Sequence, residues 1–343
     1  MSPIISTLAN ASARGYRSFA AALVSYIAVS HTGGSNVSAY PWLPGFGTKY
    51  ANPATAPTGT GLNLTFKPQG DAIAVAHAAP PAVSAYPWSP GFGTKYADPA
   101  TLPTGTGWSV KFRPQGDAIA VSSATSPYVA GYPWSSGFGT KYANPATLPG
   151  NVGYDLAFKP QGDAIAVAHY ISPNITAYPW SSGFGTKYAN PATLPAGTGW
   201  GVSFSPSGNA IAVGHASSPY LTAYPWSSGF GTKYANPATI PAGEGKRVAF
   251  KPQGDVIAVA HANSPYLTAY PWSSGFGTKY ANPATLPTGT GWGVNFSPSG
   301  EAIAVAHGTT PFVTAYPWSS GFGTKYANPA TLPSNNGYGV AFI

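Results

Sequence analysis

The tripeptide Tyr-Pro-Trp occurs seven times in this chain, and successive copies begin 46 residues apart. A fixed period of this length indicates repeated copies of one supersecondary unit that stack on one another. The copies begin at Tyr40, Tyr86, Tyr132, Tyr178, Tyr224, Tyr270 and Tyr316. Seven periods leave 21 of the 343 residues over, so we predict an N-terminal segment, residues 1–21, and one repeat domain, residues 22–343.

The repeat over residues 199–239 contains three stretches in which large apolar residues alternate with small or polar ones, as they do in β-strands. These stretches lie at 200–204, 211–215 and 220–224, and turn residues separate them. A short fourth strand is expected at 232–235. Because 42 glycines and 37 prolines disfavour long helices, the sequence predicts an all-β, seven-bladed β-propeller with four antiparallel strands per blade.

The two ends of the repeat region predict how the ring closes. Residues 337–342 repeat the first strand of the unit, after which the chain stops, whereas residues 27–31 match a second strand, residues 73–77. We therefore predict a composite closing blade, in which the C-terminal strand is the innermost one and the N-terminal strands supply the rest.

Two resemblances follow from these motifs. The stretch Phe-Ser-Pro-Ser-Gly-Asn-Ala-Ile-Ala-Val at 204–213, with a third strand that ends at Trp226, resembles the WD40 repeat superfamily. The string Leu-Ala-Asn-Ala-Ser-Ala-Arg-Gly-Tyr at 8–16 resembles the N-terminal lead of virion structural and tail proteins of tailed, especially marine, phages, and Tyr-Pro-Trp-Ser-Ser-Gly-Phe-Gly-Thr-Lys-Tyr is similar to their repeats. The second resemblance implies a non-enzymatic virion protein that displays its propeller for host-surface adhesion or as tail or capsid decoration.

In that interpretation the N-terminal segment attaches the propeller to other virion proteins, and the protein is homo-oligomeric in the virion. The candidate assembly residues are Ile4, Ile5, Leu8, Arg14, Tyr16 and Arg17. Two alternatives are open: a secreted, lectin-like propeller whose first 20 or so residues are an export signal, and an intracellular scaffold. No apolar stretch reaches about 18 residues, so no membrane-spanning helix is predicted.

One position of the repeat accounts for most of the net charge of +8. It holds Lys49, Lys95, Lys141, Lys187, Lys233, Lys279 and Lys325, and without them nine basic residues face eight acidic ones. Nucleic-acid binding, which needs a general basic surface, is therefore not expected. This lysine ring either binds an anionic surface such as a host glycan, or protects the outer edge of each sheet from pairing with another sheet.

The position that opens each first strand varies between repeats that are otherwise nearly identical. It holds Leu62, Trp108, Tyr154, Trp200, Lys246, Trp292 and Tyr338. Strand ends in a propeller reach the flat face near the channel, where Trp108, Trp200 and Trp292 are candidates for stacking on sugar rings. Variation by drift explains the same pattern.

No sequence signature supports catalysis, a metal site or a cofactor. The chain has no cysteine, and only 7% of its residues are charged. Carboxylates recur at one turn position, as Asp71, Asp117, Asp163 and Asp255, which places them on separate blades and too far apart for paired acid and base catalysis. Six histidines also recur at one position, where the seventh repeat has Ser123, and a structural role is expected for them.

Overall fold

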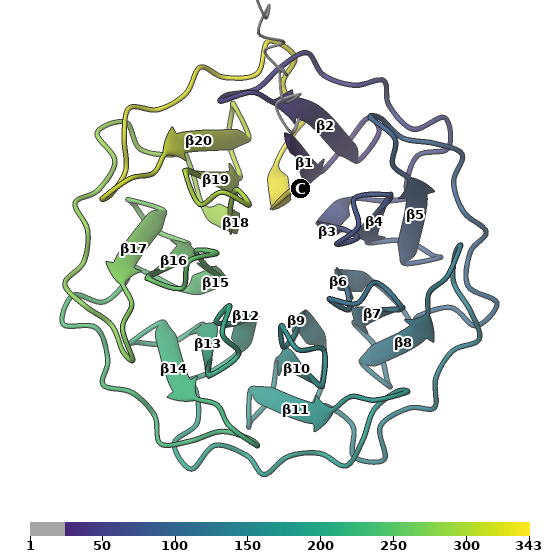
Figure 1. Cartoon of the computed structure of the whole chain (residues 1–343), viewed down its shortest axis with the longest axis horizontal. Helices are drawn as coiled ribbons and strands as arrows, with labels where there is room; N and C mark the ends of the chain where they lie inside the picture. Colours follow the sequence, from purple (N-terminus) through teal and green to yellow (C-terminus); the bar gives the residue numbers. More distant parts are fainter. Residues whose placement is uncertain (1–24) are drawn as a thin grey trace, which may run out of the picture.

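The computed structural model describes residues 25–343, which form seven three-stranded antiparallel sheets arranged radially around a common axis (Figure 1). This is the arrangement of a seven-bladed β-propeller, and no helix occurs in the described part of the chain. The strands are β1 (Ser25–His31), β2 (Val37–Trp42), β3 (Gly61–Phe66), β4 (Ala72–His77), β5 (Val83–Pro87), β6 (Gly107–Phe112), β7 (Ala118–Ser123), β8 (Val129–Pro133), β9 (Gly153–Phe158), β10 (Ala164–His169), β11 (Ile175–Pro179), β12 (Gly199–Phe204), β13 (Ala210–His215), β14 (Leu221–Pro225), β15 (Gly245–Phe250), β16 (Val256–His261), β17 (Leu267–Pro271), β18 (Gly291–Phe296), β19 (Ala302–His307), β20 (Val313–Pro317) and β21 (Gly337–Phe342).

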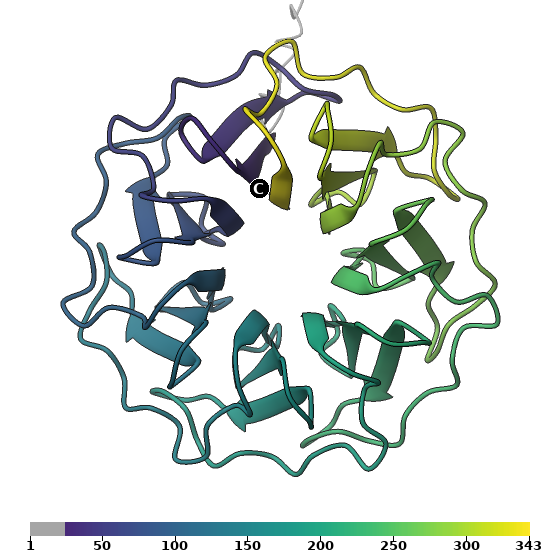
Figure 2. The same ribbon diagram turned by 180° about the vertical axis from the view of Figure 1, so that it is seen from behind.

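In six of the seven sheets the strands follow chain order from the axis outward, and in the sheet of β1 and β2 the last strand, β21, lies next to the axis. The sheet β12-β13-β14 is typical, and its first strand β12 lies next to the axis (Figures 1 and 2). Seven such inner strands therefore surround the axis: β3, β6, β9, β12, β15, β18 and β21. Side chains from blades that are distant in sequence meet there.

The predicted composite blade is confirmed. The strands of this sheet are ordered β2-β1-β21, and β21 pairs antiparallel with β1 from Ile27 opposite Phe342 to His31 opposite Gly337. The backbone N–H of Tyr26 donates to the carbonyl of Ile343 at 2.8 Å. The ring is thus closed by strand pairing between the first and last described strands.

Adjacent blades interlock as the alternation in the sequence predicts. The small face of β10, made by Ala164, Ala166 and Ala168, packs against Ile211 and Val213 on the large face of β13. Burying both faces of every sheet in this way removes apolar surface from water, which stabilises the ring.

The seven Tyr-Pro-Trp tryptophans are buried in the blade interfaces. Trp226, only 4% exposed, meets Tyr188, Phe204 and Phe230 edge to face, with ring centroids 5.0 to 5.2 Å apart. Edge-to-face contacts at this distance are the preferred geometry of aromatic pairs. The tryptophans are therefore core residues.

The predicted fourth strand of each blade is wrong. In the repeat of β14, Gly231 N–H donates to the carbonyl of Pro225 and Tyr234 N–H donates to that of Ala223. The donors are three residues apart and the acceptors two, so no regular ladder can continue, and Pro225 has no N–H to return a bond. Each blade has three strands and an irregular outer segment.

The outer segment still ties neighbouring blades together. Tyr224, which is fully buried, donates its hydroxyl hydrogen to the carbonyl of Thr193 on the outer segment of the preceding repeat, at 2.7 Å. The same bond recurs at 2.7 to 2.9 Å from each tyrosine of the seven Tyr-Pro-Trp motifs to a threonine carbonyl. The outer segments thus connect the blades around the rim.

Candidate functional site

The inner strands bring one position of the repeat, which follows the variable strand-opening position, into a single layer around the axis. This position holds Asn63, Ser109, Asp155, Gly201, Arg247, Gly293 and Gly339, each 46 residues from the next. Four of these residues are polar or charged and three are glycines, in repeats that are otherwise nearly the same. This layer, like the strand-opening position next to it, therefore departs from the sevenfold sequence pattern.

Asp155 on β9 is the centre of a hydrogen-bond network in this layer. Its Oδ1 accepts the hydroxyl hydrogen of Ser109 at 2.7 Å, and Ser109 Oγ accepts from Asn63 Nδ2 at 3.1 Å. Its Oδ2 accepts from the backbone N–H of Val202 at 3.1 Å. Because the carboxylate is only 3% exposed, these donors compensate for its lost hydration.

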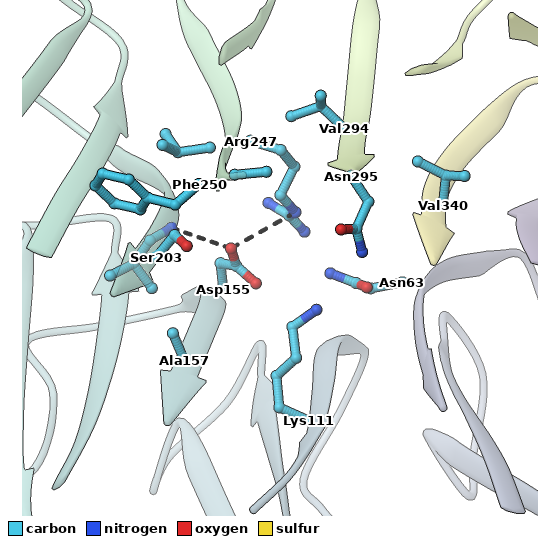
Figure 3. Close-up of a pocket in the computed structure, with 13 residues that line it drawn as sticks. Asn63, Lys111, Asp155, Ala157, Ser203, Arg247, Phe250, Val294, Asn295 and Val340 are labelled. Carbon is cyan, nitrogen blue, oxygen red and sulfur yellow. Dashed lines mark hydrogen bonds and ion pairs between the residues drawn. The ribbon is translucent and has the colours of Figure 1, made fainter. Parts of the chain in front are cut away.

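Arg247 on β15 supplies the opposite charge. Its Nε lies 3.7 Å from Asp155 Oδ2 in an ion pair, which dashed lines mark in Figure 3 together with the Val202 bond. Its terminal nitrogens donate to the backbone carbonyls of Trp200 at 2.6 Å and Tyr154 at 3.2 Å. The guanidinium is therefore held in place by residues of two other blades, those of β9 and β12.

The ion pair lines a cavity of about 160 Å³ between the inner strands. Lys111, Ser203 and Asn295 line the same cavity. Figure 3 shows the amine of Lys111 and the amide of Asn295 turned toward the same space as Asp155. Burial lowers the pKa of Lys111, the neighbouring Asp155 charge opposes this shift, and Arg247 adds to it. Lys111 is thus an amine that gives up its proton more readily than an exposed lysine.

Gly201 on β12 makes room for the arginine. A Cβ at this position would lie 2.7 Å from the carbonyl oxygen of Lys246 and 2.8 Å from the Cα of Arg247, both backbone atoms that cannot move independently. The glycine therefore allows β15 to approach closely enough for Arg247 to reach Asp155.

We expect Gly201→Ala to lower the free energy of unfolding by about 1 to 3 kcal/mol, because the added methyl overpacks this contact. Thermal unfolding followed by circular dichroism measures the effect. Gly308→Ala is the matched control, since its Cβ would meet only Trp292 Nε1 at 3.4 Å and other repeats have alanine there, such as Ala262. Equal melting temperatures for the two variants would contradict this account of Gly201.

A second cavity of about 290 Å³ lies directly beside the first, and Arg247 lines both. Its wall is the variable strand-opening position: Leu62, Trp108, Tyr154, Trp200, Lys246, Trp292 and Tyr338. The structure therefore brings the three candidate tryptophans Trp108, Trp200 and Trp292 together in one wall. We call this space the aromatic cavity and the first one the polar cavity.

The aromatic wall is ordered by contacts between its own side chains. The ring centroid of Tyr154 lies 5.1 Å from that of Trp108 and 4.3 Å from that of Trp200. The ammonium of Lys246 lies 4.0 Å from the Trp200 centroid and 5.1 Å from that of Trp292, and it forms an ion pair with Glu244. These cation–π contacts fix a positive charge between two indole rings.

The lysine ring lies on the outer segments, far from both cavities in the fold. Each of its seven ammonium groups donates to the side chain of the residue three positions on: Asn52, Asp98, Asn144, Asn190, Asn236, Asn282 and Asn328. Partial burial lowers the pKa of Lys49 and Lys141. The predicted binding role of this ring stays a prediction, as does its role in edge protection.

The six histidines are fully buried, and each bonds across its own blade. His215 Nε2 lies 2.9 Å from the hydroxyl of Thr222, and its Nδ1 lies 2.9 Å from the carbonyl of Ser217. Within residues 25–343 no group of three histidine, aspartate or glutamate side chains is placed to hold a metal ion. The histidines are built into the packing of the blades.

Several predictions concern residues outside the structure. The candidate assembly residues Ile4, Ile5, Leu8, Arg14, Tyr16 and Arg17 all precede residue 25 and lie outside the described residues. In the part that is described, no helix has the length and apolar character needed to cross a membrane. The predicted partners and location stay predictions.

Sequence reasoning missed the polar cavity. The sequence pattern that indicates this cavity lies one residue after the variable strand-opening position. There Asp155 and Arg247 carry charge, whereas the other repeats have small or uncharged polar residues. Aligning the repeats at that residue would have identified a charged pair on inner strands. Such an alignment of the repeats does not show that Asp155 on β9 and Arg247 on β15, two blades apart, are in contact.

Comparisons with known proteins match the fold but not the sequence. No family model and no curated protein matches the chain. Among solved structures, a putative 6-phosphogluconolactonase from Bacteroides uniformis has a TM-score of 0.69 at 14% identity, over 93% of this chain and 99% of that one. The periplasmic gluconolactonase PpgL of Pseudomonas aeruginosa gives the same four values, and a functionally unknown protein from Desulfotomaculum acetoxidans has a TM-score of 0.69 at 9% identity, over 92% and 98%. At these identities the similarity shows the propeller fold.

The prediction of a non-enzymatic virion protein is wrong, because the chain shares nearly its whole fold with proteins named as lactonases. No match supports the resemblance to phage virion proteins. The lectin-like and scaffold alternatives are non-enzymatic as well, so the same finding counts against them. The physical error was to consider only the turn carboxylates such as Asp163, and to overlook Asp155, which lies at the axis where side chains of several blades meet.

Proposed function

We propose that this propeller is an enzyme that hydrolyses a small lactone in its polar cavity. The observation that carries the proposal is the convergence of Asp155, Arg247 and Lys111 from three blades on one cavity of about 160 Å³. Convergent charged groups in a concave site, one with a shifted pKa, are typical of active sites. The names of the proteins with the same fold supply the substrate class.

Lactone hydrolysis requires a base for water and donors for the developing oxyanion. Lys111, as the neutral amine, takes a proton from water while the water oxygen forms a bond to the lactone carbonyl carbon. The resulting tetrahedral oxyanion is stabilised by the positive charge of Arg247. The ring C–O bond then breaks, the leaving alkoxide takes the proton from the Lys111 ammonium, and the product is a hydroxy acid.

Asp155 is a positioning residue in this scheme. Its oxygens accept hydrogen bonds from Ser109 and Val202 and pair with Arg247, so in this scheme it holds the guanidinium in place while Lys111 takes the proton from water. Asn63 and Asn295 line the same cavity and offer amide groups to a ring oxygen.

The test is hydrolysis of δ-valerolactone, δ-gluconolactone and 3,4-dihydrocoumarin, followed by base uptake at constant pH. We expect at least one to be hydrolysed well above its spontaneous rate, and Asp155→Asn to lower kcat/KM by about 10- to 100-fold, because the carboxylate that positions Arg247 is lost. Asp163→Asn is the matched control, since Asp163 pairs only with Lys159 in an exposed turn.

Two results would overturn the proposal. The first is a rate no higher than background for all three lactones with a protein whose melting curve shows that it is folded. The second is equal activity in Asp155→Asn and Asp163→Asn.

A further inference from the structure

The aromatic cavity, of about 290 Å³, is larger than the polar cavity, of about 160 Å³, and Arg247 lines both. Of its eight lining residues, five are aromatic and one is Leu62, and only Lys246 and Arg247 carry charge. The ammonium of Lys246 is already engaged by Glu244 and two indole rings, and two of the Arg247 nitrogens donate to backbone carbonyls. The other polar atoms of the wall are the hydroxyls of Tyr154 and Tyr338 and the indole N–H groups of the three tryptophans, so most of its surface is apolar.

This composition disfavours a sugar ring. Each sugar hydroxyl that enters a site without a hydrogen-bond partner loses its hydration without compensation. A planar apolar ring has no such groups to satisfy and makes stacking or edge contacts with Trp108, Tyr154 and Trp200, which are already held in position by one another. Lys246 adds a positive charge, which attracts the face of a π system.

Size and placement agree with an aromatic occupant. A cavity of about 150 Å³ accommodates a benzene molecule in other proteins, so about 290 Å³ accommodates a ring together with its substituents. Because Arg247 lines both cavities, a ring in the aromatic cavity places a lactone carbonyl attached to it beside the guanidinium. The two cavities together match a molecule with one apolar and one polar end.

We infer that the aromatic cavity is a subsite for a planar aromatic ring, and that the substrates of this protein are aryl-fused or aryl-substituted lactones in preference to sugar lactones. This inference rests on the proposed lactone hydrolysis for its substrate class. The subsite itself rests only on the aromatic wall.

The kinetic test compares 3,4-dihydrocoumarin with δ-valerolactone and δ-gluconolactone. We expect kcat/KM to be at least about 10-fold higher for the aryl-fused lactone, since its ring buries apolar surface that the others lack. Trp200→Leu should remove most of this preference by raising KM for dihydrocoumarin more than it raises KM for δ-valerolactone. Leucine already occupies the equivalent place in another repeat, at Leu62, so the fold accommodates the substitution.

The matched control is Tyr170→Leu. Tyr170 is 53% exposed and contacts Tyr154 at 6.5 Å between centroids, but it does not line the cavity. Its substitution should leave the preference for dihydrocoumarin unchanged.

A binding measurement separates this inference from the proposed function. The hydrolysis product of dihydrocoumarin, 3-(2-hydroxyphenyl)propanoate, is titrated calorimetrically into the folded protein and into Trp200→Leu. Binding that Trp200→Leu weakens, without hydrolysis of any lactone, would support the subsite and overturn the proposed enzyme. Hydrolysis of δ-gluconolactone at least as efficient as that of dihydrocoumarin, unaffected by Trp200→Leu, would support the enzyme and overturn the subsite. If the folded protein neither binds this product nor hydrolyses any of the lactones, both the subsite and the proposed enzyme are overturned.

Discussion

Lowering the pH from 7.5 to 4.5 is expected to unfold the propeller cooperatively. Burial lowers the pKa of His77, His169, His215, His261 and His307 from 6.5 to about 4, and it lowers the pKa of His31 as well. A group whose pKa is depressed on folding stabilises the fold above its unfolded pKa, and the stability is lost as the pH falls toward the folded value. At pH 5 each such histidine costs about 2 kcal/mol, so five together cost on the order of 10 kcal/mol, comparable with the whole stability of a typical domain. Thermal melting curves at half-unit pH steps measure this loss.

One repeat has Ser123 at the position where the other six have histidine, and this suggests the control for the prediction. His215→Ser introduces the residue that one blade already has, and it removes one proton-binding group from the unfolded state. The variant should show a shallower fall of melting temperature with pH than the original chain. A melting temperature that stays constant between pH 7.5 and 5 would contradict the role assigned to the histidines.

Lys111→Met is expected to lower kcat/KM for lactone hydrolysis by about 100-fold or more, since general-base catalysis typically contributes at least that factor. Methionine keeps an apolar stem of similar length and removes only the amine. In the original chain, activity above the spontaneous rate should fall as the pH drops through the lowered pKa of Lys111, because the amine is then protonated and cannot accept a proton from water. The pH dependence of kcat/KM measures this, and the variant should lack that part of the profile.

Lys159→Met is the control, because Lys159 forms its ion pair with Asp163 in a turn and does not line either cavity. Its activity should equal that of the original chain. Full activity in Lys111→Met would exclude Lys111 as the base, whatever the outcome for Asp155.

The period of 46 residues was sufficient to predict the fold, because a fixed repeat of alternating strands can bury both faces only by stacking. The same reasoning predicted the pairing of β21 with β1, since residues 27–31 lacked an inner strand and residues 337–342 lacked an outer one. The prediction of a fourth strand at residues 232–235 was wrong for a physical reason. Pro225 has no N–H, and the two hydrogen bonds that Gly231 and Tyr234 donate to the third strand are not spaced as in a regular ladder.

The site was harder to predict than the fold for a physical reason. Asp155 and Arg247 are 92 positions apart and belong to no sequence motif, and the radial packing of the blades brings their side chains to within 3.7 Å of each other. The lowered pKa of Lys111 likewise results from burial, which a residue's neighbours in sequence do not reveal. The aromatic cavity was partly predicted, since its wall coincides with the variable strand-opening position.

The pairing that closes the ring also determines how the molecule would respond to tension. Ser25 and Ile343 lie at the same end of the antiparallel pair formed by β1 and β21, where the Ser25 hydroxyl donates to the Ile343 carbonyl at 2.6 Å. A force that pulls these two residues apart would load the hydrogen bonds one after another, as in a zipper, instead of shearing them all at once. The seam between these two strands is then the mechanically weak joint of the ring, and its opening would displace Val340 on β21 from the polar cavity while the other six blades kept their own three strands.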